Sequence, residues 1–454
     1  MSPFGFTPDS EGDDDRDKSD EDGKVPEDFA EMMRQMQEQI QKQFEELGIN
    51  LGPGNTAGFA NPFAAFASQG KEALPNAIVR DIAKKFVQTQ GSQPIGTKDV
   101  TVVDNAFEIA ELWLNEATLF PATLVPTTPR AVSRLDWVDL TLPGWQETME
   151  PLATGLAQAI TGLLDQAMSQ QVQDSDNGEA VAAPMGAIVG LLRSFIGSMI
   201  ATQLGQAIGG ISATATGVHD LALPLLTPAR PVLIPENIEK WSVDLEIPKS
   251  EIYLFHALRE AAIARLFQHN PWIVSYIRSS IVDYGRGIHI DLEAIQRQAE
   301  DAMQNFDPAT ATDMNSLNIA LNNGIFTPEE TLEQRAALSK LETVLALVDG
   351  WADEVTSLAV GNRLPALTQL REMYRRQRAT SAPAQQLFKS LLGLEVSPKL
   401  AREASAFWEK IRQARDIATR DRIWSGILPS AQELLEPESF LSSTLIPDDL
   451  SGLK

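Results

Sequence analysis

Apolar side chains recur at helical spacing along nearly the whole chain from Leu74 onward. Between Leu74 and Val87 they occupy positions 74, 78, 79, 82, 83, 86 and 87, a period that gives an α-helix one apolar face. The two-residue alternation of a half-buried strand is almost absent, and only Ala229–Pro235 reads as an extended segment. The pattern therefore predicts an all-α protein. Further helices are expected at about 100–119, 133–168, 236–245, 249–268, 272–286, 291–303, 315–322, 328–360, 363–378, 384–392, 397–417 and 430–435.

The chain divides by composition into a polar N-terminal region and a large helical remainder. Residues 1–28 hold eleven acidic and three basic side chains, and a segment this charged buries too little apolar surface to offset its ordering entropy. We expect residues 1–70 to form an acidic disordered tail with one helix and a linker. Residues 71–228 are expected to form an N-terminal helical lobe, and residues 229–454 a C-terminal one.

One amphipathic helix is predicted at residues 27–47, where Phe29, Met32, Met36, Ile40 and Phe44 recur on one face. Residues 48–69 then read as a flexible linker. The simpler interpretation is that this helix packs on its own domain, and it is the one we favour. The alternative is an adaptor, in which the tethered, Met-rich helix docks into a groove on a partner.

Small residues stand four positions apart at Gly197, Ala201, Gly205 and Gly209, so they form a smooth stripe on one helix face. We expect another helix backbone to approach this stripe closely, which compensates the cost of glycine in a helix. The surrounding stretch at 184–211 is apolar, but it contains Arg193 and is interpreted as a buried helix of a soluble core rather than a membrane span.

Charge and composition exclude several classes of function. The net charge of −25 repels phosphate backbones and anionic membrane surfaces, so we expect a protein or peptide partner of unknown identity, with no nucleic acid and no membrane insertion. The absence of cysteine excludes disulfides, thiolate metal sites and a cysteine nucleophile. The opening residues lack the basic and apolar regions of a secretory signal, which favours a cytoplasmic location.

The most suggestive chemistry lies on the helix expected after Pro248, which reads PKSEIYLFHALREAAIARLFQHNPW. His256 and Glu260 stand four positions apart on one face, and Ile263 continues that face. The segment ALREAAIARLFQHNPWI resembles the motif helix of an actinobacterial family, the zincin-like metallopeptidases of type 2, described as zinc-dependent metalloproteases or hydrolases. Similar segments follow in the same order along the chain: PFGF, SRLDWVDLTLPGW, HDLALPLL, LIPENIEKW, LETVLALVDGWADEV and RRQRATSAPAQQLFKSLLGLE.

The resemblance implies a large multi-helix zincin-like fold and a zinc site. A His-Glu-x-x-His helix presents two imidazoles to zinc and a glutamate to its bound water, and a later carboxylate completes the site. The matching positions here are Arg259, Glu260 and Ile263, with Asp349 at the later carboxylate. Arginine does not ligate metals and isoleucine has no donor atom, so we expect a pseudoenzyme with a vestigial Glu260 and no cofactor. Arg259 is expected to pair with Asp349, and Glu260 with an arginine such as Arg265.

Two further interpretations stay open. The chain could be an active metal-dependent hydrolase, peptidase-like by resemblance, with zinc in an atypical site made by His256, Glu260 and Asp349. It could also be the adaptor described above. Among weaker candidates, His219 and Asp220 are interpreted as loop or cap residues. Arg371–Arg378 is interpreted as a solvated basic helix face, with an anion or an acidic partner segment, such as the tail at residues 9–28, as the alternative occupant. The tryptophans are expected to anchor the core.

Overall fold

The computed structural model describes residues 74–122, 129–172, 197–198, 200–243, 245–286, 331–380 and 398–444. All of them lie in the larger of two compact units, Gln69–Lys454, and the smaller unit is Met1–Ser68. The acidic tail and the amphipathic helix expected at 27–47 lie outside the described residues, as do the helices expected at 291–303, 315–322 and 384–392. The proposed boundary between two lobes at residue 228 stays a prediction.

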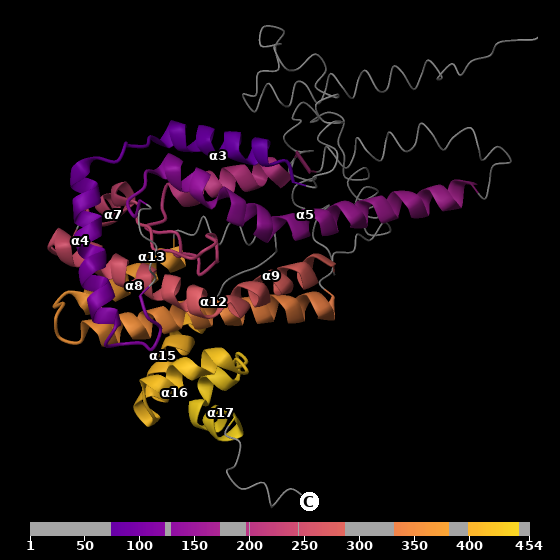
Figure 1. Ribbon diagram of the computed structural model, residues 1–454. Coiled ribbons are helices and arrows are strands. Elements are labelled where there is room, and N and C mark those ends of the chain that lie inside the picture. Colours follow the sequence, from indigo (N-terminus) through magenta and orange to yellow (C-terminus); the bar gives the residue numbers. More distant parts are fainter. Residues whose placement is uncertain are drawn as a thin grey trace, which may run out of the picture. The chain divides into compact units, whose positions relative to one another are not determined.

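The prediction of an all-α protein is confirmed, since the described part is helical with no strand (Figure 1). The extended segment at Ala229–Pro235 makes only two isolated bridges through Leu233, to Ala131 and to Gly217. The named helices are α3 (Asn76–Gln90), α4 (Thr97–Leu114), α5 (Arg134–Val172), α7 (Pro235–Trp241), α8 (Lys249–His269), α9 (Pro271–Arg286), α12 (Leu332–Val360), α13 (Leu367–Thr380), α15 (Pro398–Ala414), α16 (Ile417–Arg422) and α17 (Pro437–Thr444), with short 3₁₀ turns η1 (Ile423–Ser425) and η2 (Glu433–Leu435).

Helices α8 and α12 form the centre of this unit. Pro248 precedes α8 and Asn270 ends it directly before Pro271, as the backbone limits of proline require. Every residue from Ile252 to Phe267 is buried, because α8 packs against α4, α9, α12 and α13. In Figure 1 the orange helix α12 runs alongside α9 and α15, which it also contacts. A helix enclosed in this way has no solvent face, so any charged residue on it must find a partner inside the protein.

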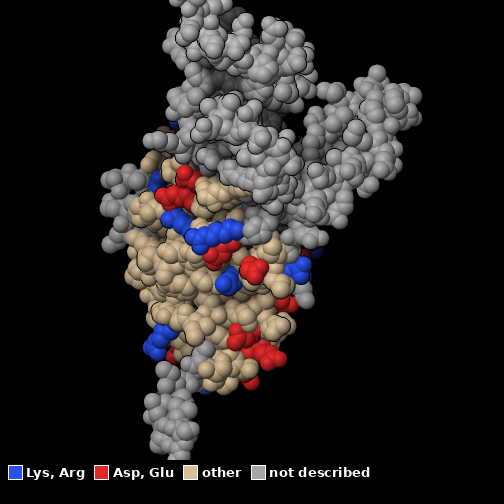
Figure 2. Space-filling view, turned by 90° about the vertical axis from the view of Figure 1, so that its right-hand side faces the viewer, with Lys and Arg blue, Asp and Glu red and all other residues tan. Residues whose placement is uncertain are grey.

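Charged side chains also occur in small mixed groups on the surface. Figure 2 shows one face on which lysine and arginine lie beside aspartate and glutamate, while most of the described surface is neither. Among the residues that the structure describes, no helix has both the length and the apolar character that crossing a bilayer requires.

The tryptophans serve as the predicted core anchors. Trp137, Trp145, Trp351, Trp408 and Trp424 are fully buried, and Trp113, Trp241 and Trp272 are partly buried against the same core. Trp424 joins two of the others, stacking on Trp408 with ring centroids 5.1 Å apart and meeting Trp351 edge-on at 6.4 Å. These rings attach the C-terminal helices to α12.

The close helix approach predicted for the small-residue stripe is confirmed where the structure describes it. Residues 200–212 are helical, and α3 crosses them at Gly205 and Gly209. A Cβ added at Gly205 would lie 2.8 Å from the Val79 carbonyl oxygen, and one at Gly209 would lie 2.8 Å from Phe86 Cβ. Glycine is therefore required at both positions because no side-chain atom fits between the helices.

This contact predicts that Gly205→Ala destabilises the protein even though alanine favours helix formation. Overpacking of this kind costs about 1–3 kcal/mol, and the Val79 carbonyl is backbone and cannot swing aside. The matched control is Gly162→Ala on α5, where an added Cβ meets nothing within 4 Å and the change should stabilise by up to about 1 kcal/mol. Urea denaturation of both variants measures the difference. Equal stabilisation by both substitutions would contradict the close approach.

Candidate functional site

Glu260 lies near the middle of α8, and its carboxylate is enclosed by hydrogen-bond donors. It accepts backbone N–H groups from Val218 and His219 at 3.0 Å each and from Val232 at 3.1 Å. His219 Nδ1 lies 2.9 Å from Glu260 Oε1, and both side chains are buried. A Cβ at Gly217 would lie 2.5 Å from Glu260 Oε2, so glycine there makes room for the carboxylate. The glutamate thus holds the loop before α7 against α8.

The predicted ion pair between Glu260 and Arg265 is wrong. Arg265 binds the Glu111 side chain and backbone carbonyl and also the Phe120 carbonyl oxygen. The physical reason is helix geometry: five positions along an α-helix correspond to a rotation of about 140° from the starting face. Arg265 therefore faces α4, while Glu260 faces the loop.

His219 and Asp220 lie in the loop before α7, as interpreted from the sequence, but their side chains make contacts inside the protein. Asp220 accepts a hydrogen bond of 2.9 Å from the Thr216 hydroxyl and another from the Thr216 backbone N–H. The same hydroxyl oxygen lies 3.1 Å from His256 Nδ1 on α8. Burial, followed by the negative charge of Glu260, raises the pKa of Asp220. Sequence reasoning missed these partners because they lie about forty positions apart.

Arg259 precedes Glu260 on α8 and points toward α12. Its Nη2 atom lies 2.5 Å from Asp349 Oδ1, so the predicted ion pair is confirmed. Its Nη1 atom lies 3.5 Å from Asp353 Oδ1, and its guanidinium carbon sits 4.2 Å from the centre of the Tyr374 ring. Only 5% of the Arg259 side chain is exposed. The cation is thus held by two carboxylates and an aromatic face.

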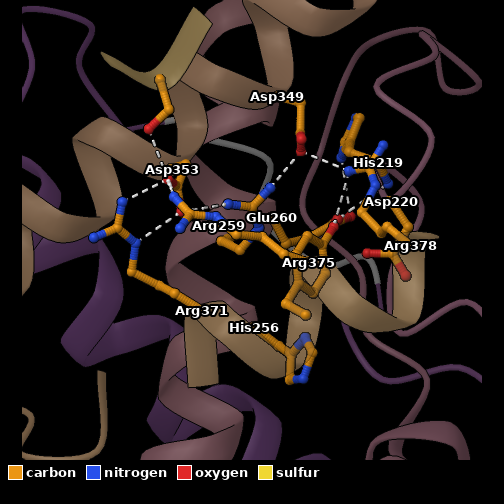
Figure 3. Close-up of polar contacts among 12 residues, drawn as sticks. His219, Asp220, His256, Arg259, Glu260, Asp349, Asp353, Arg371, Arg375 and Arg378 are labelled. Carbon is orange, nitrogen blue, oxygen red and sulfur yellow. Dashed lines mark hydrogen bonds and ion pairs between the residues drawn. The ribbon is translucent and has the colours of Figure 1, made fainter. Parts of the chain in front are cut away.

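The arginines of α13 also converge on α12, so the interpretation of this helix face as merely solvated is wrong. Arg371 binds Asp353 with Nε at 3.0 Å and Nη2 at 2.6 Å, and Arg375 Nη2 lies 2.8 Å from the same carboxylate. Arg378 Nη1 lies 2.5 Å from Asp349 Oδ1. Positions 371, 375 and 378 are spaced by four and three residues, which places them on one helix face. Figure 3 shows how they surround the two aspartates.

Asp353 is the most strongly held carboxylate of the group. Burial alone would raise its pKa, but hydrogen bonding by Arg371 and the positive charges of Arg259, Arg371 and Arg375 hold the pKa far below its usual range. The Ser405 hydroxyl of α15 donates a further hydrogen bond of 2.7 Å. Asp353 therefore stays ionised and joins α8, α12, α13 and α15.

A model of the zincin-like metallopeptidase family matches residues 76–441. That match covers most of the chain, and the chain belongs to this family. A solved structure from Chloroflexus aurantiacus, described as a presumed hydrolase with a novel fold, is similar over 82% of this chain and 98% of its own, with 17% identity and a TM-score of 0.53. At that identity the likeness shows the fold alone. Among curated proteins, none matches.

Because zincin-like proteins usually bind zinc, the donor atoms of His256 matter. Burial, followed by the charge of Arg259, lowers the pKa of His256 to about 3, so the imidazole is neutral at ordinary pH. Its Nδ1 atom contacts Thr216, and its Nε2 atom has no hydrogen-bond partner among the residues that the structure describes. The ring packs edge-on against Trp241, Phe255 and Tyr374. This is one imidazole in an aromatic enclosure, and the ring lies apart from the ion pairs in Figure 3.

The remaining candidate ligands do not fit zinc. Glu260 is saturated by the loop and His219, and Asp349 is paired with Arg259 and Arg378. Ile263 is buried and has no donor atom. Within the described ranges, no three His, Asp or Glu side chains come together in a way that could hold a metal ion, and a zinc site needs at least three protein ligands.

The geometry predicts that Glu260→Gln destabilises the fold. The substitution puts an amide NH₂ among backbone N–H groups that need acceptors, and breaking a buried charged network costs about 3–5 kcal/mol. Glu108→Gln on the exposed face of α4 is the matched control and should change stability by less than about 0.5 kcal/mol. Chemical denaturation compares the two. A Glu260→Gln variant as stable as the control would argue for a glutamate kept for catalysis.

Proposed function

We propose that this zincin-like protein holds no catalytic zinc and acts by binding another molecule instead of cleaving it. The observation that carries the proposal is the contact of Arg259 with Asp349, at 2.5 Å between α8 and α12. In a zinc-dependent relative, two histidines of the motif helix and a carboxylate of a later helix would meet at the metal. Here a guanidinium and a carboxylate make the connection between the corresponding helices directly.

The chemistry of the charged groups supports an ion pair in place of a metal ion. A guanidinium stays protonated at any physiological pH, so it repels a divalent cation and attracts the carboxylate that would otherwise ligate it. Asp349 is contacted by Arg259 and Arg378, and both would have to leave before Asp349 could bind a metal. Ile263 stands one turn after Arg259 and offers a hydrocarbon. An ion pair of this kind keeps the scaffold joined without a metal.

The alternative is a hydrolase with an unconventional site. It is favoured by one observation, the 2.9 Å contact between Glu260 and His219, because a carboxylate beside an imidazole is a common arrangement in general-base catalysis. Both side chains are enclosed, however, with His219 at 0% exposure. The three backbone N–H groups on Glu260 give the pair a sufficient structural role. The adaptor hypothesis concerns residues 27–47 and stays a prediction.

The proposal predicts that purified protein contains far less than one zinc per chain and does not cleave casein. Elemental analysis after dialysis against micromolar zinc measures the first, and release of labelled peptides measures the second. The comparison variant is Arg259→His with Ile263→His, which supplies two imidazoles one turn apart and should take up zinc. One zinc per wild-type chain, lost in Asp349→Asn and kept in the surface variant Asp283→Asn, would contradict the proposal.

A further inference from the structure

Arg371 and Arg375 of α13 bring their guanidinium groups to a single oxygen atom. The Nη2 atom of Arg371 lies 2.6 Å from Asp353 Oδ2, and the Nη2 atom of Arg375 lies 2.8 Å from the same oxygen. Arg259 approaches the other oxygen of Asp353 at 3.5 Å. One carboxylate thus faces three cations, and its single negative charge only partly offsets their positive charges.

Positive charge exceeds negative charge in this cluster, defined as Arg259, Arg371 and Arg375 with Asp349 and Asp353. Two other carboxylates near this cluster, those of Glu354 and Asp220, have partners of their own. Glu354 binds Arg412. Asp220 accepts hydrogen bonds from Thr216 and lies near Arg378, which also binds Asp349. A chain with a net charge of −25 therefore carries a local excess of cations around Asp353.

The excess positive charge is partly exposed, on two arginine side chains that Asp353 holds in place. The side chains of Arg371 and Arg375 are 27% and 37% exposed. Asp353 holds both through Nη2, and it also accepts Nε of Arg371. Three further nitrogen atoms make no hydrogen bond to the described part of the chain: Nη1 of Arg371, and Nη1 and Nε of Arg375. Because the carboxylate already orders both side chains, an incoming acceptor loses little rotamer entropy on binding.

We propose that the outer edge of this cluster, at Arg371 and Arg375, binds a phosphate group. Guanidinium forks match the oxygens of phosphate, and a tetrahedral dianion can accept N–H groups from two forks at once while its charge offsets the local excess of cations. The phosphate group is either free or esterified to a small molecule. This inference deepens the binding role proposed above and rests on it by naming the chemistry of the bound molecule.

Titration calorimetry of the full chain tests the site with inorganic phosphate and with phenyl phosphate, each against sodium chloride at equal ionic strength. We expect saturable binding of at least one phosphate probe and none of chloride. Tighter binding of inorganic phosphate points to a free anion, and tighter binding of phenyl phosphate to an ester. A wild-type protein whose heat signal is the same in phosphate, phenyl phosphate and chloride overturns the proposal.

Variants then locate the site. Arg375→Gln should weaken phosphate binding by about tenfold or more, since it removes charge-assisted hydrogen bonds. Arg376→Gln is the matched control on the same helix: this side chain is 75% exposed and pairs with Glu372, and its loss should leave affinity within about twofold. Arg371→Gln provides a second variant if Arg375→Gln does not fold. Equal weakening by Arg375→Gln and Arg376→Gln would overturn the assignment.

The zinc measurement and the phosphate measurement can fail separately. A protein free of zinc that ignores phosphate loses the anion site and keeps the metal-free proposal. A protein that binds one zinc per chain and also binds phosphate through Arg375 loses the metal-free proposal and keeps the anion site.

Discussion

The contact of Arg259 with Asp349 and Asp353 is the interaction on which the rest of the site depends. Arg259 is buried on a helix without a solvent face, and an isolated charge there would cost far more than a folded domain can supply. Two aspartates one turn apart on α12 solve this problem, and the arginines of α13 are then drawn to the same carboxylates. Removing one member of such a network leaves a buried charge behind, at about 3–5 kcal/mol. The charges therefore join α8, α12 and α13.

Neighbouring residues on α8 stabilise two different sides of the unit. Arg259 faces the ion pairs of α12 and α13, while Glu260, rotated by about 100° on the helix, accepts the N–H groups of the segment before α7. In a zincin the corresponding helix supplies metal ligands and a catalytic glutamate. In our proposal, Arg259 and Glu260 still point into the protein and still have polar partners, but all of these partners are groups of the protein itself. The scaffold is retained, and the polar interior has a structural role.

The sequence predicts those features that depend on local pattern. Helical periodicity predicts the all-α fold, and the small-residue spacing predicts the close approach at Gly205. The contact of Arg259 with Asp349 follows instead from the family resemblance, which implies that the two helices pack together. The partners of Glu260 could not be predicted, because backbone N–H groups of a distant loop carry no residue signature. The role of α13 was missed for a related reason: a basic helix face has the same sequence pattern whether it meets solvent or buried carboxylates.

In our proposal, a guanidinium occupies the position between α8 and α12 where a zinc-dependent relative would hold its metal. Anomalous diffraction from crystals grown with zinc, recorded at the zinc absorption edge, tests this claim directly. We expect no anomalous peak beside Asp349 or Glu260, and we expect the Arg259 guanidinium to remain in contact with Asp349. A peak between the two helices, with Arg259 displaced from Asp349, would contradict it.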